Sequence, residues 1–239
     1  MRLPELKKIL QELNEAGYVQ SKRKGPTGIG YTLESRLGVN ENNLPIPDIG
    51  GRTEIKATRN TSRKLITLFT FNRSVWQMKQ SDVIRKWGYH DNSRNRLALY
   101  STVSAIMSNP QGLEVVVPEG SETIVVIDSE TKEIIASWDL YHIVGKFMTK
   151  FERLLLVHAD TRAREKGEEF HFNKAYLLSE PSAKTFRDAF LEGTAFIDIR
   201  MHLKPSGAPR NHGTGFRIHE HNLTSLFGRV DNLLGKDQT

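Results

Sequence analysis

Three charged side chains lie close together in the segment PDIGGRTEIKATR, residues 47–59, and their spacing suits the hydrolysis of a phosphodiester. The segment alternates as a strand does, so Glu54 and Lys56 project from one face, about 6.6 Å apart. A turn with two glycines precedes Glu54 and can bring Asp48 back beside it. Two carboxylates at one point are oxygen ligands that Mg²⁺ prefers, and the carbonyl of Ile55 can add a third.

This arrangement, Pro47-Asp48 followed by Glu54-Ile55-Lys56, is the PD-(D/E)xK pattern of nucleases. A bound metal would neutralise charge on the phosphate, while Lys56 would orient the attacking water or help to lower its pKa. The pattern is short and chance matches are common, so an exposed strand with ordinary surface charges stays open as the alternative.

A further carboxylate, Glu34, is placed beside the apolar stripe of a short helix expected between Thr27 and Gly38. A carboxylate is costly in such a position unless it has a partner, and Glu34 could complete the acidic site. The alternative is an ion pair between Glu34 and either Arg36 or Lys22.

The composition limits the class of protein. The chain has 239 residues, 38% of them hydrophobic, which suits one large domain or two fused lobes with a sizeable core. Lysine and arginine exceed aspartate and glutamate by 34 to 28, and a cluster of that excess would indicate a polyanionic partner. The absence of cysteine excludes disulfides, thiol catalysis and cysteine-bound zinc. The charged N-terminus is no signal peptide and no apolar run approaches a membrane span, so we expect a cytoplasmic protein with no membrane partner.

Hydrophobic periodicity predicts helices and strands without strict alternation, and hence a mixed α/β or α+β fold. Helices are expected over Leu6, Leu10 and Leu13, between Thr27 and Gly38, around VIRKWG, over DLYHIVGKFMTKF, between Ser182 and Gly193, and through Leu223, Leu226, Val230 and Leu233. Strands are expected at residues 53–58, KLITLFTF, LEVVV, TIVVID, KEIIASW, LLLVHAD, FHFNKAYLL and AFIDIRM, and a loop is expected at LKPSGAPRNHGTGFR. The core is expected to include Trp76, Trp87 and Trp138.

Several segments, taken in order along the chain, carry a family resemblance. They are SKRKGPTGIGYTLESRLG, ENNLPIPDIGGRTEIKATR, LITLFT, ASWDL, FHFNKAYLL and NHGTGFRI. With these segments the chain resembles the MvaI/BcnI family of Type II restriction endonucleases, which are similar in turn to the mismatch-repair nicking enzyme MutH. The resemblance implies a PD-(D/E)xK nuclease core, with a mixed central sheet flanked by helices and two lobes that form a cleft around double-stranded DNA. It implies a single two-lobed domain over 1–239, whose catalytic lobe includes about 1–72 and whose recognition lobe includes about 160–225.

The resemblance also implies an activity and its catalytic residues. A monomer would use Mg²⁺ to cut five-base-pair sites of the CCNGG type, and would nick one strand in each binding event. By position, Asp48, Glu54 and Lys56 match the family's catalytic triplet, with the metal held at Asp48, Glu54 and Ile55. Glu34 matches the helix glutamate that supports the site in the MutH-like group.

Candidate DNA-binding residues occur in two places. Lys22, Arg23 and Lys24 precede the short helix and suit phosphate contacts, with a solvated charge run as the alternative. The expected loop 204–217 contains Lys204, Arg210, Asn211, His212 and Arg217. Arginine can bond two acceptors of guanine and asparagine can read adenine, so we expect base recognition in this loop.

The segment NHGTGFRI matches a family segment that contributes to DNA reading, which favours His212 and Arg217 among these residues. An ion pair between Arg217 and Glu220 is the alternative. A metal site at His212, His219 and His221 was also considered, but this spacing fits no strong zinc pattern.

Thr70 lies at the end of LITLFT. At this place BcnI-like members, which take a central C or G, carry histidine, and MvaI-like members, which take a central A or T, carry threonine. The resemblance therefore favours CCWGG, where W is A or T, over CCSGG, where S is C or G.

Two other functions stay open. One is a MutH-like strand nickase that partners activate, and the other is a non-catalytic, sequence-specific DNA-binding module, which would have no need of Lys56. The final segment GRVDNLLGKDQT is expected to be a helix with a polar tail, compatible with a natural end or with a linker to an additional C-terminal domain.

Overall fold

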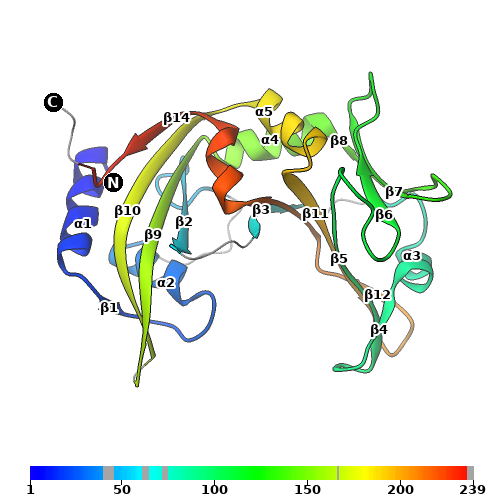
Figure 1. Cartoon of the computed structure of the whole chain (residues 1–239), viewed down its shortest axis with the longest axis horizontal. Coiled ribbons are helices and arrows are strands. Elements are labelled where there is room, and N and C mark those ends of the chain that lie inside the picture. The colour runs from blue at the N-terminus through cyan, green and yellow to red at the C-terminus, as the bar shows by residue number, and fades with distance from the viewer. Residues whose placement is uncertain (40–45, 61–64, 72–74, 166, 236–239) are drawn as a thin grey trace. The chain divides into compact units, whose positions relative to one another are not determined.

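The computed structural model describes residues 1–39, 46–60, 65–71, 75–165 and 167–235 of the chain. The chain divides into two compact units, each built from separated stretches of sequence (Figure 1). Unit 1 comprises Met1–Arg63, Met148–Ser182 and Phe227–Thr239, and unit 2 comprises Lys64–Phe147 and Ala183–Leu226. The expected roles of a catalytic lobe and a recognition lobe are not tested by this division and stay predictions.

Unit 1 is built on one sheet whose strands lie side by side in the order β1, β10, β9 and β2, with β14 also paired to β10 (Figure 1). The bounds are β1 Val19–Gln20, β2 Thr53–Arg59, β9 Arg153–Arg164, β10 Gly167–Pro181 and β14 Phe227–Asn232. The strands β2 and β9 run parallel, whereas the other neighbours run antiparallel. Because β2 is the end of this order, one side of its backbone is left for groups other than a strand.

Two helices bury one face of this sheet. They are α1, Leu3–Glu15, and α2, Gly28–Arg36. The leucines of α1 and the stripe of α2 are buried as their spacing predicted, and they pack with alternate residues of the strands. The shared cluster includes Leu6, Leu10, Leu13, Ile29, Leu33, Leu37, Ile55, Leu155, Val157, Ala175 and Leu177. By strand alternation, Glu54 and Lys56 belong to the opposite face.

Unit 2 contains two sheets. The larger has the order β3, β13, β11, β5 and β4, with β12 paired to β11, and the smaller has the order β6, β7 and β8. The bounds are β3 Leu65–Phe71, β4 Tyr89–Asp91, β5 Arg96–Val103, β6 Leu113–Val116, β7 Thr123–Asp128, β8 Ile134–Asp139, β11 Ala195–Leu203, β12 Pro209–Asn211 and β13 Thr214–His219. The remaining elements are α3 Gln80–Trp87, α4 Leu140–Lys150, α5 Ala183–Leu191 and the 3-10 helix η1 Glu220–Leu226. This is the mixed α+β fold that the sequence predicted.

Aromatic rings dominate the core of unit 2. Phe147 and Phe186 stack with ring centres 4.5 Å apart, and Phe69 stacks on Phe216 at 5.0 Å. Trp87 and Trp138 are buried, as predicted. Trp76 is half-buried and meets Trp138 edge-on at 6.4 Å. In the described parts of the chain, no helix is long and apolar enough to cross a membrane.

The expected last helix is wrong. Leu223 and Leu226 lie in the buried 3-10 helix η1, but the next residues form the strand β14, and Val230 is exposed. The apolar spacing fits a helix, yet β10 offers an open edge here because β1 covers only two of its residues. Pairing with that edge satisfies the backbone of β14, which outweighs local periodicity.

The loop expected between residues 203 and 217 is also wrong, because most of it is paired backbone. The strand β12 pairs with β11, and β13 is inserted between β11 and β3. The polar stretch after VIRKWG likewise contains β4 and β5, for which no strand was predicted. Glycine, arginine and asparagine weaken the local strand signal in both regions, and tertiary pairing supplies the strand.

A pair of glycines in unit 2 tests the packing. A Cβ at Gly88 would lie 2.2 Å from the carbonyl oxygen of Ile84, whereas at Gly145, inside α4, no described atom would lie within 4 Å of it. We expect Gly145→Ala to stabilise the protein by about 0.5–1 kcal/mol. Gly88→Ala should destabilise it by more than that, because the clash is with backbone. Urea unfolding midpoints check the order, and a Gly88→Ala protein as stable as the parent would contradict this packing.

Candidate active site

A tight turn returns Asp48 to the start of β2. Ile49 and Thr53 form an antiparallel bridge, with N–H to carbonyl distances of 2.9 and 3.2 Å. Between them Gly50 and Gly51 adopt φ of 58° and 68°, a conformation that favours glycine at both positions. The turn predicted from the two glycines is therefore confirmed.

The turn gives Asp48 a main-chain donor on the open side of β2. Its Oδ2 accepts the N–H of Ile55 at 2.8 Å. Among the described strands none pairs with β2 on this side, so the bond satisfies the Ile55 amide and holds the Asp48 carboxylate next to the Glu54-Ile55-Lys56 segment.

Glu54 is almost completely buried, with 4% of its surface exposed, and two lysines compensate its charge. The ammonium of Lys56 donates to Oε1 at 2.8 Å, which confirms that both side chains project from one face of β2. The ammonium of Lys150, in the last turn of α4, lies 3.2 Å from the same oxygen. Lys150 was not predicted as part of this site, because only the fold brings it to β2.

Charge and burial act against each other at Asp48. Burial raises the pKa of its carboxyl most, and the nearby Glu54 carboxylate raises it further, so the net shift is upward. The Ile55 amide and the ammoniums of Lys56 and Lys150 oppose that shift. The carboxylates of Asp48 and Glu54 therefore repel each other, and the ammonium groups of Lys56 and Lys150 offset that repulsion.

The donor chemistry of this pair fits a divalent metal ion. Asp48 and Glu54 supply carboxylate oxygens from adjacent positions, and such hard ligands suit Mg²⁺-like ions. Across the residues whose positions are described, no group of three acidic or histidine side chains gathers around a metal position. The part of the Ile55 carbonyl as a metal ligand stays a prediction.

Glu34 lies on α2, which contacts β2, and its side chain is half-buried. Its Oε1 lies 3.8 Å from the place of a Cβ on Gly30, so the carboxylate folds back along its own helix. Its participation in the acidic site stays a prediction.

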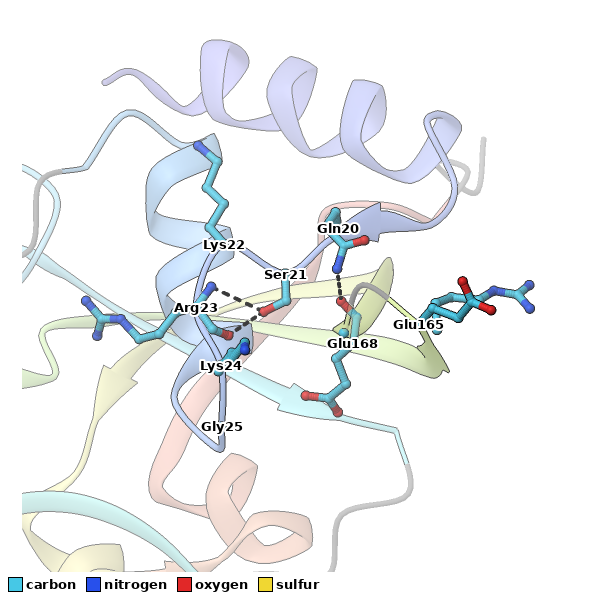
Figure 2. A pocket seen from close by; sticks show the side chains of 10 residues that line it. Gln20, Ser21, Lys22, Arg23, Lys24, Gly25, Glu165 and Glu168 are labelled. Atoms are coloured by element: carbon cyan, nitrogen blue, oxygen red, sulfur yellow. Dashed lines mark hydrogen bonds between the residues drawn. The ribbon is translucent and has the colours of Figure 1, made fainter.

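The basic segment before α2 is a turn whose backbone is held by hydrogen bonds (Figure 2). The hydroxyl of Ser21 donates to the carbonyl of Arg23 at 2.7 Å, and the amide of Lys22 donates to Thr32 Oγ1 at 3.0 Å. A Cβ on Gly28 would lie 2.4 Å from the Arg23 carbonyl, so the turn packs directly on the first residue of α2.

A pocket of about 790 Å³ lies beside this turn. The tip of the β9–β10 hairpin forms its other side, and the pocket is lined by more cations than carboxylates (Figure 2). The charged lining residues are Lys22, Arg23, Lys24, Arg164, Glu165 and Glu168. Glu168 is already paired with Arg59 at 2.7 Å. Exposed cations around an open pocket are a suitable surface for phosphate oxygens.

In unit 2, one arginine organises the segment in which base recognition was expected. Arg200 on β11 donates to Thr70 Oγ1 at 3.1 Å, to the carbonyl of Gly213 at 3.1 Å and to that of His212 at 3.3 Å. Asn211 accepts the amide of Gly213 at 2.7 Å and so shapes the same turn. Thr70 and His212 are thereby brought to one arginine, which no sequence pattern had indicated.

Three rings continue this polar surface. His202 and His212 stack with centres 5.3 Å apart, and the hydroxyl of Tyr100 lies 3.1 Å from His202 Nδ1. Desolvation, followed by the charge of nearby arginines, lowers the pKa of both histidines. The positive charges of Arg96 and Arg210 each lower the pKa of both His202 and His212. Two neutral imidazole rings therefore lie among permanent cations.

Arg217 has a carboxylate partner that the sequence did not suggest. Its Nη1 lies 2.5 Å from Asp198 on β11, and its Nη2 donates to the carbonyl of Leu65 at 2.8 Å. This guanidinium therefore links β13 to both of its neighbours. A role of Arg217 in base reading stays a prediction.

Solved structures share this fold. A complex of restriction endonuclease MvaI with cognate DNA substrate is similar over 97% of this chain and 98% of that chain, with 24% identity and a TM-score of 0.78. MvaI in the absence of DNA is similar over 97% of both chains, with 22% identity and a TM-score of 0.60. No curated protein sequence matches the chain.

Residues 6–227 match the MvaI/BcnI restriction endonuclease family. The chain belongs to this family, and the resemblance noted in the sequence is confirmed. The protein is accordingly a Type II site-specific endonuclease that acts on DNA. Enzymes of this family generally use a divalent metal ion, in agreement with the carboxylate pair at β2.

The charge balance at β2 leads to opposite effects of two conservative substitutions. In metal-free buffer we expect Asp48→Asn to raise the thermal midpoint, because an amide relieves the repulsion and can still accept the Ile55 amide. Glu54→Gln should lower the free energy of unfolding by roughly 1–2 kcal/mol, and the thermal midpoint by several degrees, because Lys56 and Lys150 lose their counter-charge. Calorimetry checks both, and a shift in the same direction for the two variants would show that the lysines do not balance Glu54.

Proposed function

We propose that the protein hydrolyses phosphodiester bonds of double-stranded DNA at CCNGG-type sites, with CCWGG preferred, in a Mg²⁺-dependent reaction. The observation that carries the proposal is the Asp48–Glu54–Lys56 assembly at β2, in a chain of the MvaI/BcnI family. The solved complex of MvaI with cognate DNA substrate supports duplex DNA as the ligand.

Asp48, Glu54 and the Ile55 carbonyl would hold the metal ion. The ion would supply positive charge to the phosphate and acidify water. Lys56 would donate a hydrogen bond to the attacking water and hold it in line with the phosphorus, while the ion pair with Lys150 would hold the Glu54 side chain in place. Water oxygen would bond to phosphorus as the P–O3′ bond breaks, so that the products carry 5′-phosphate and 3′-hydroxyl ends. Glu34 would support this site from α2.

Base reading would fall to the polar surface of unit 2. The organised turn around Arg200 supports His212, Arg210 and Asn211 as groups that face the bases, since arginine and asparagine suit guanine and adenine edges. Thr70, bonded to Arg200, would face the central base pair, as in MvaI-like members that take A or T. Lys22, Arg23 and Lys24 would contact phosphates, and Arg217 would contribute either a DNA contact or the support of β13.

A single active site serves one strand at a time. We infer that the enzyme acts as a monomer and nicks one strand per binding event, then turns over on the pseudo-symmetric site to cut the other. The two CCNGG strands differ only at the centre, so the same surface can bind the site in either orientation.

Digestion of a plasmid with and without Mg²⁺, followed by sequencing of the cut ends, tests the proposal. We expect Mg²⁺-dependent cuts confined to CCWGG, with a nicked circle appearing before the linear form. Cuts at CCSGG would contradict the central-base assignment, and simultaneous double-strand cuts at low enzyme would contradict a monomer. Glu54→Ala and Lys56→Ala should lower cleavage by several orders of magnitude while leaving DNA binding measurable, and an active Glu54→Ala enzyme would disprove the assigned site.

The basic turn leads to a salt-dependence prediction. If Lys22 and Lys24 each contact a phosphate, the paired variant Lys22→Ala/Lys24→Ala should reduce the slope of log K against log salt by about two. A control with the same charge change is Lys8→Ala/Lys184→Ala, whose lysines are exposed and paired within their own helices. Fluorescence anisotropy on a cognate duplex measures both slopes. Equal slopes for the two variants would identify the turn as a solvated charge run.

A further inference from the structure

The face of the unit 1 sheet that carries Glu54 and Lys56 continues beyond them as a polar surface. In the parallel register, Lys56 pairs with Leu156 and Thr58 with His158, so His158 follows Leu156 on the same face. Leu154 and Leu156 are buried, His158 is half-buried, and Lys174, its partner on β10, is exposed. The surface therefore opens to solvent as it leaves the acidic site.

His158 and Lys174 form a close pair on this surface. Burial lowers the pKa of His158 most, and the charge of Lys174 lowers it further, so a neutral imidazole lies next to an ammonium group. The ring of Tyr176 meets His158 edge-on with centres 5.9 Å apart, which limits its rotation. A neutral N–H donor beside a cation is a suitable arrangement for a phosphate oxygen.

A bulge in β10 sets the position of Lys174. The β9–β10 register shifts between Phe172 and Lys174, which leaves Asn173 as the extra residue. Without this extra residue, Phe172 and Lys174 could not both keep their observed partners on β9, and Lys174 would be displaced from the side of His158.

Three polar side chains hold the bulge. Asn60, just after β2, donates to Asp160 at 2.7 Å and to Asn173 at 3.0 Å. Asn173 donates to the other oxygen of Asp160 at 2.5 Å. Each carboxylate oxygen of Asp160 thus accepts an amide hydrogen, and the network ties β2, β9 and β10 together at one level of the sheet. A polar network whose hydrogen bonds are satisfied in this way makes the bulge rigid, and it therefore fixes the position of Lys174 on β10.

The distance from Lys56 suits a neighbouring phosphate. Lys56 on β2 lies opposite Leu156 on β9, which lies opposite Tyr176 on β10, and Lys174 is two residues from Tyr176. The Cα atoms of Lys56 and Lys174 are therefore roughly 12 Å apart. Phosphates advance by about 3.4 Å per base pair along the duplex axis, so two side chains at this separation span at most about three to four base pairs.

We propose that Lys174 and His158 bind a backbone phosphate within about three to four base pairs of the cleaved bond, and that the Asn60–Asp160–Asn173 network positions them. The proposal rests on the proposed cleavage of duplex DNA, which it deepens by adding a second anchor for the strand beside the acidic site. These residues set the register of the DNA over Lys56, and they read no base.

A phosphate scan tests the pair. Cognate duplexes carry one neutral methylphosphonate at each position up to about five base pairs from the cut, and binding is measured without Mg²⁺. The parent enzyme should lose about tenfold in affinity at one or two positions in the expected window. Lys174→Ala should bind the unmodified duplex about tenfold more weakly and show no further loss at those positions, because the contact is already gone. Equal sensitivity of Lys174→Ala at every position, or its unaltered binding to the unmodified duplex, would overturn the proposal.

Control variants separate this contact from general charge and from folding. Lys174→Arg should restore binding, and Lys8→Ala, which removes the same charge from α1, should bind like the parent. Asn173→Ala should bind the unmodified duplex more weakly and show a smaller further loss at the same phosphate positions, although Lys174 is present. A thermal midpoint is recorded to confirm that the variant is folded. Parent-like binding by a folded Asn173→Ala would overturn the role of the network. If the parent enzyme cuts DNA but Lys174→Ala loses nothing, this inference alone fails, whereas a parent that neither binds nor cuts DNA refutes the proposed function itself.

Discussion

The buried carboxylate of Glu54 is the constraint on which the rest of unit 1 depends. An ionised group that is 4% exposed is tolerable only with compensation, and here Lys56 and Lys150 both approach one of its oxygens. This requirement fixes the end of α4 against the start of β2. The glycine turn then adds Asp48 to a place already crowded with negative charge, and the Ile55 amide holds it there. The result is a pair of carboxylates held close together by two ammonium groups and one main-chain amide.

The contacts that could be predicted from the sequence are those between residues close to Glu54 along the chain, namely Asp48 and Lys56. Strand alternation fixes the relation of Glu54 to Lys56, and the two glycines fix the return of Asp48. Lys150 and Arg200 escaped prediction because their partners are distant in sequence, and nothing in the local spacing of a lysine or an arginine shows what it will meet. Where the local pattern was wrong, as in β14, an open strand edge elsewhere in the fold decided the outcome.

The larger sheet of unit 2 shows how a single strand serves both the core and a polar surface. Along β11, Ile197, Ile199 and Met201 are buried, while Asp198, Arg200 and His202 alternate with them and carry the polar contacts. The cross-strand partners of these polar residues are Thr102, Tyr100 and Ala98 on β5. Polar groups placed on a paired strand share the rigidity of the sheet, so they would lose less conformational entropy on contact with a ligand than the same groups on a free loop. That is the physical difference between the expected loop and the strands that replace it.

Unit 1 is built from stretches near both ends of the chain, so it cannot be completed until unit 2 has been synthesised. The strand β14 belongs to unit 1 and pairs along β10, yet it follows nearly all of unit 2 in the sequence. During synthesis the sheet that bears Asp48, Glu54 and Lys56 therefore lacks its β14 edge until residues 227–232 have left the ribosome. A prematurely terminated chain contains every acidic and basic group of the site, but the edge of β10 stays uncovered. Completion of the unit 1 sheet is thus tied to synthesis of the unit interleaved with it.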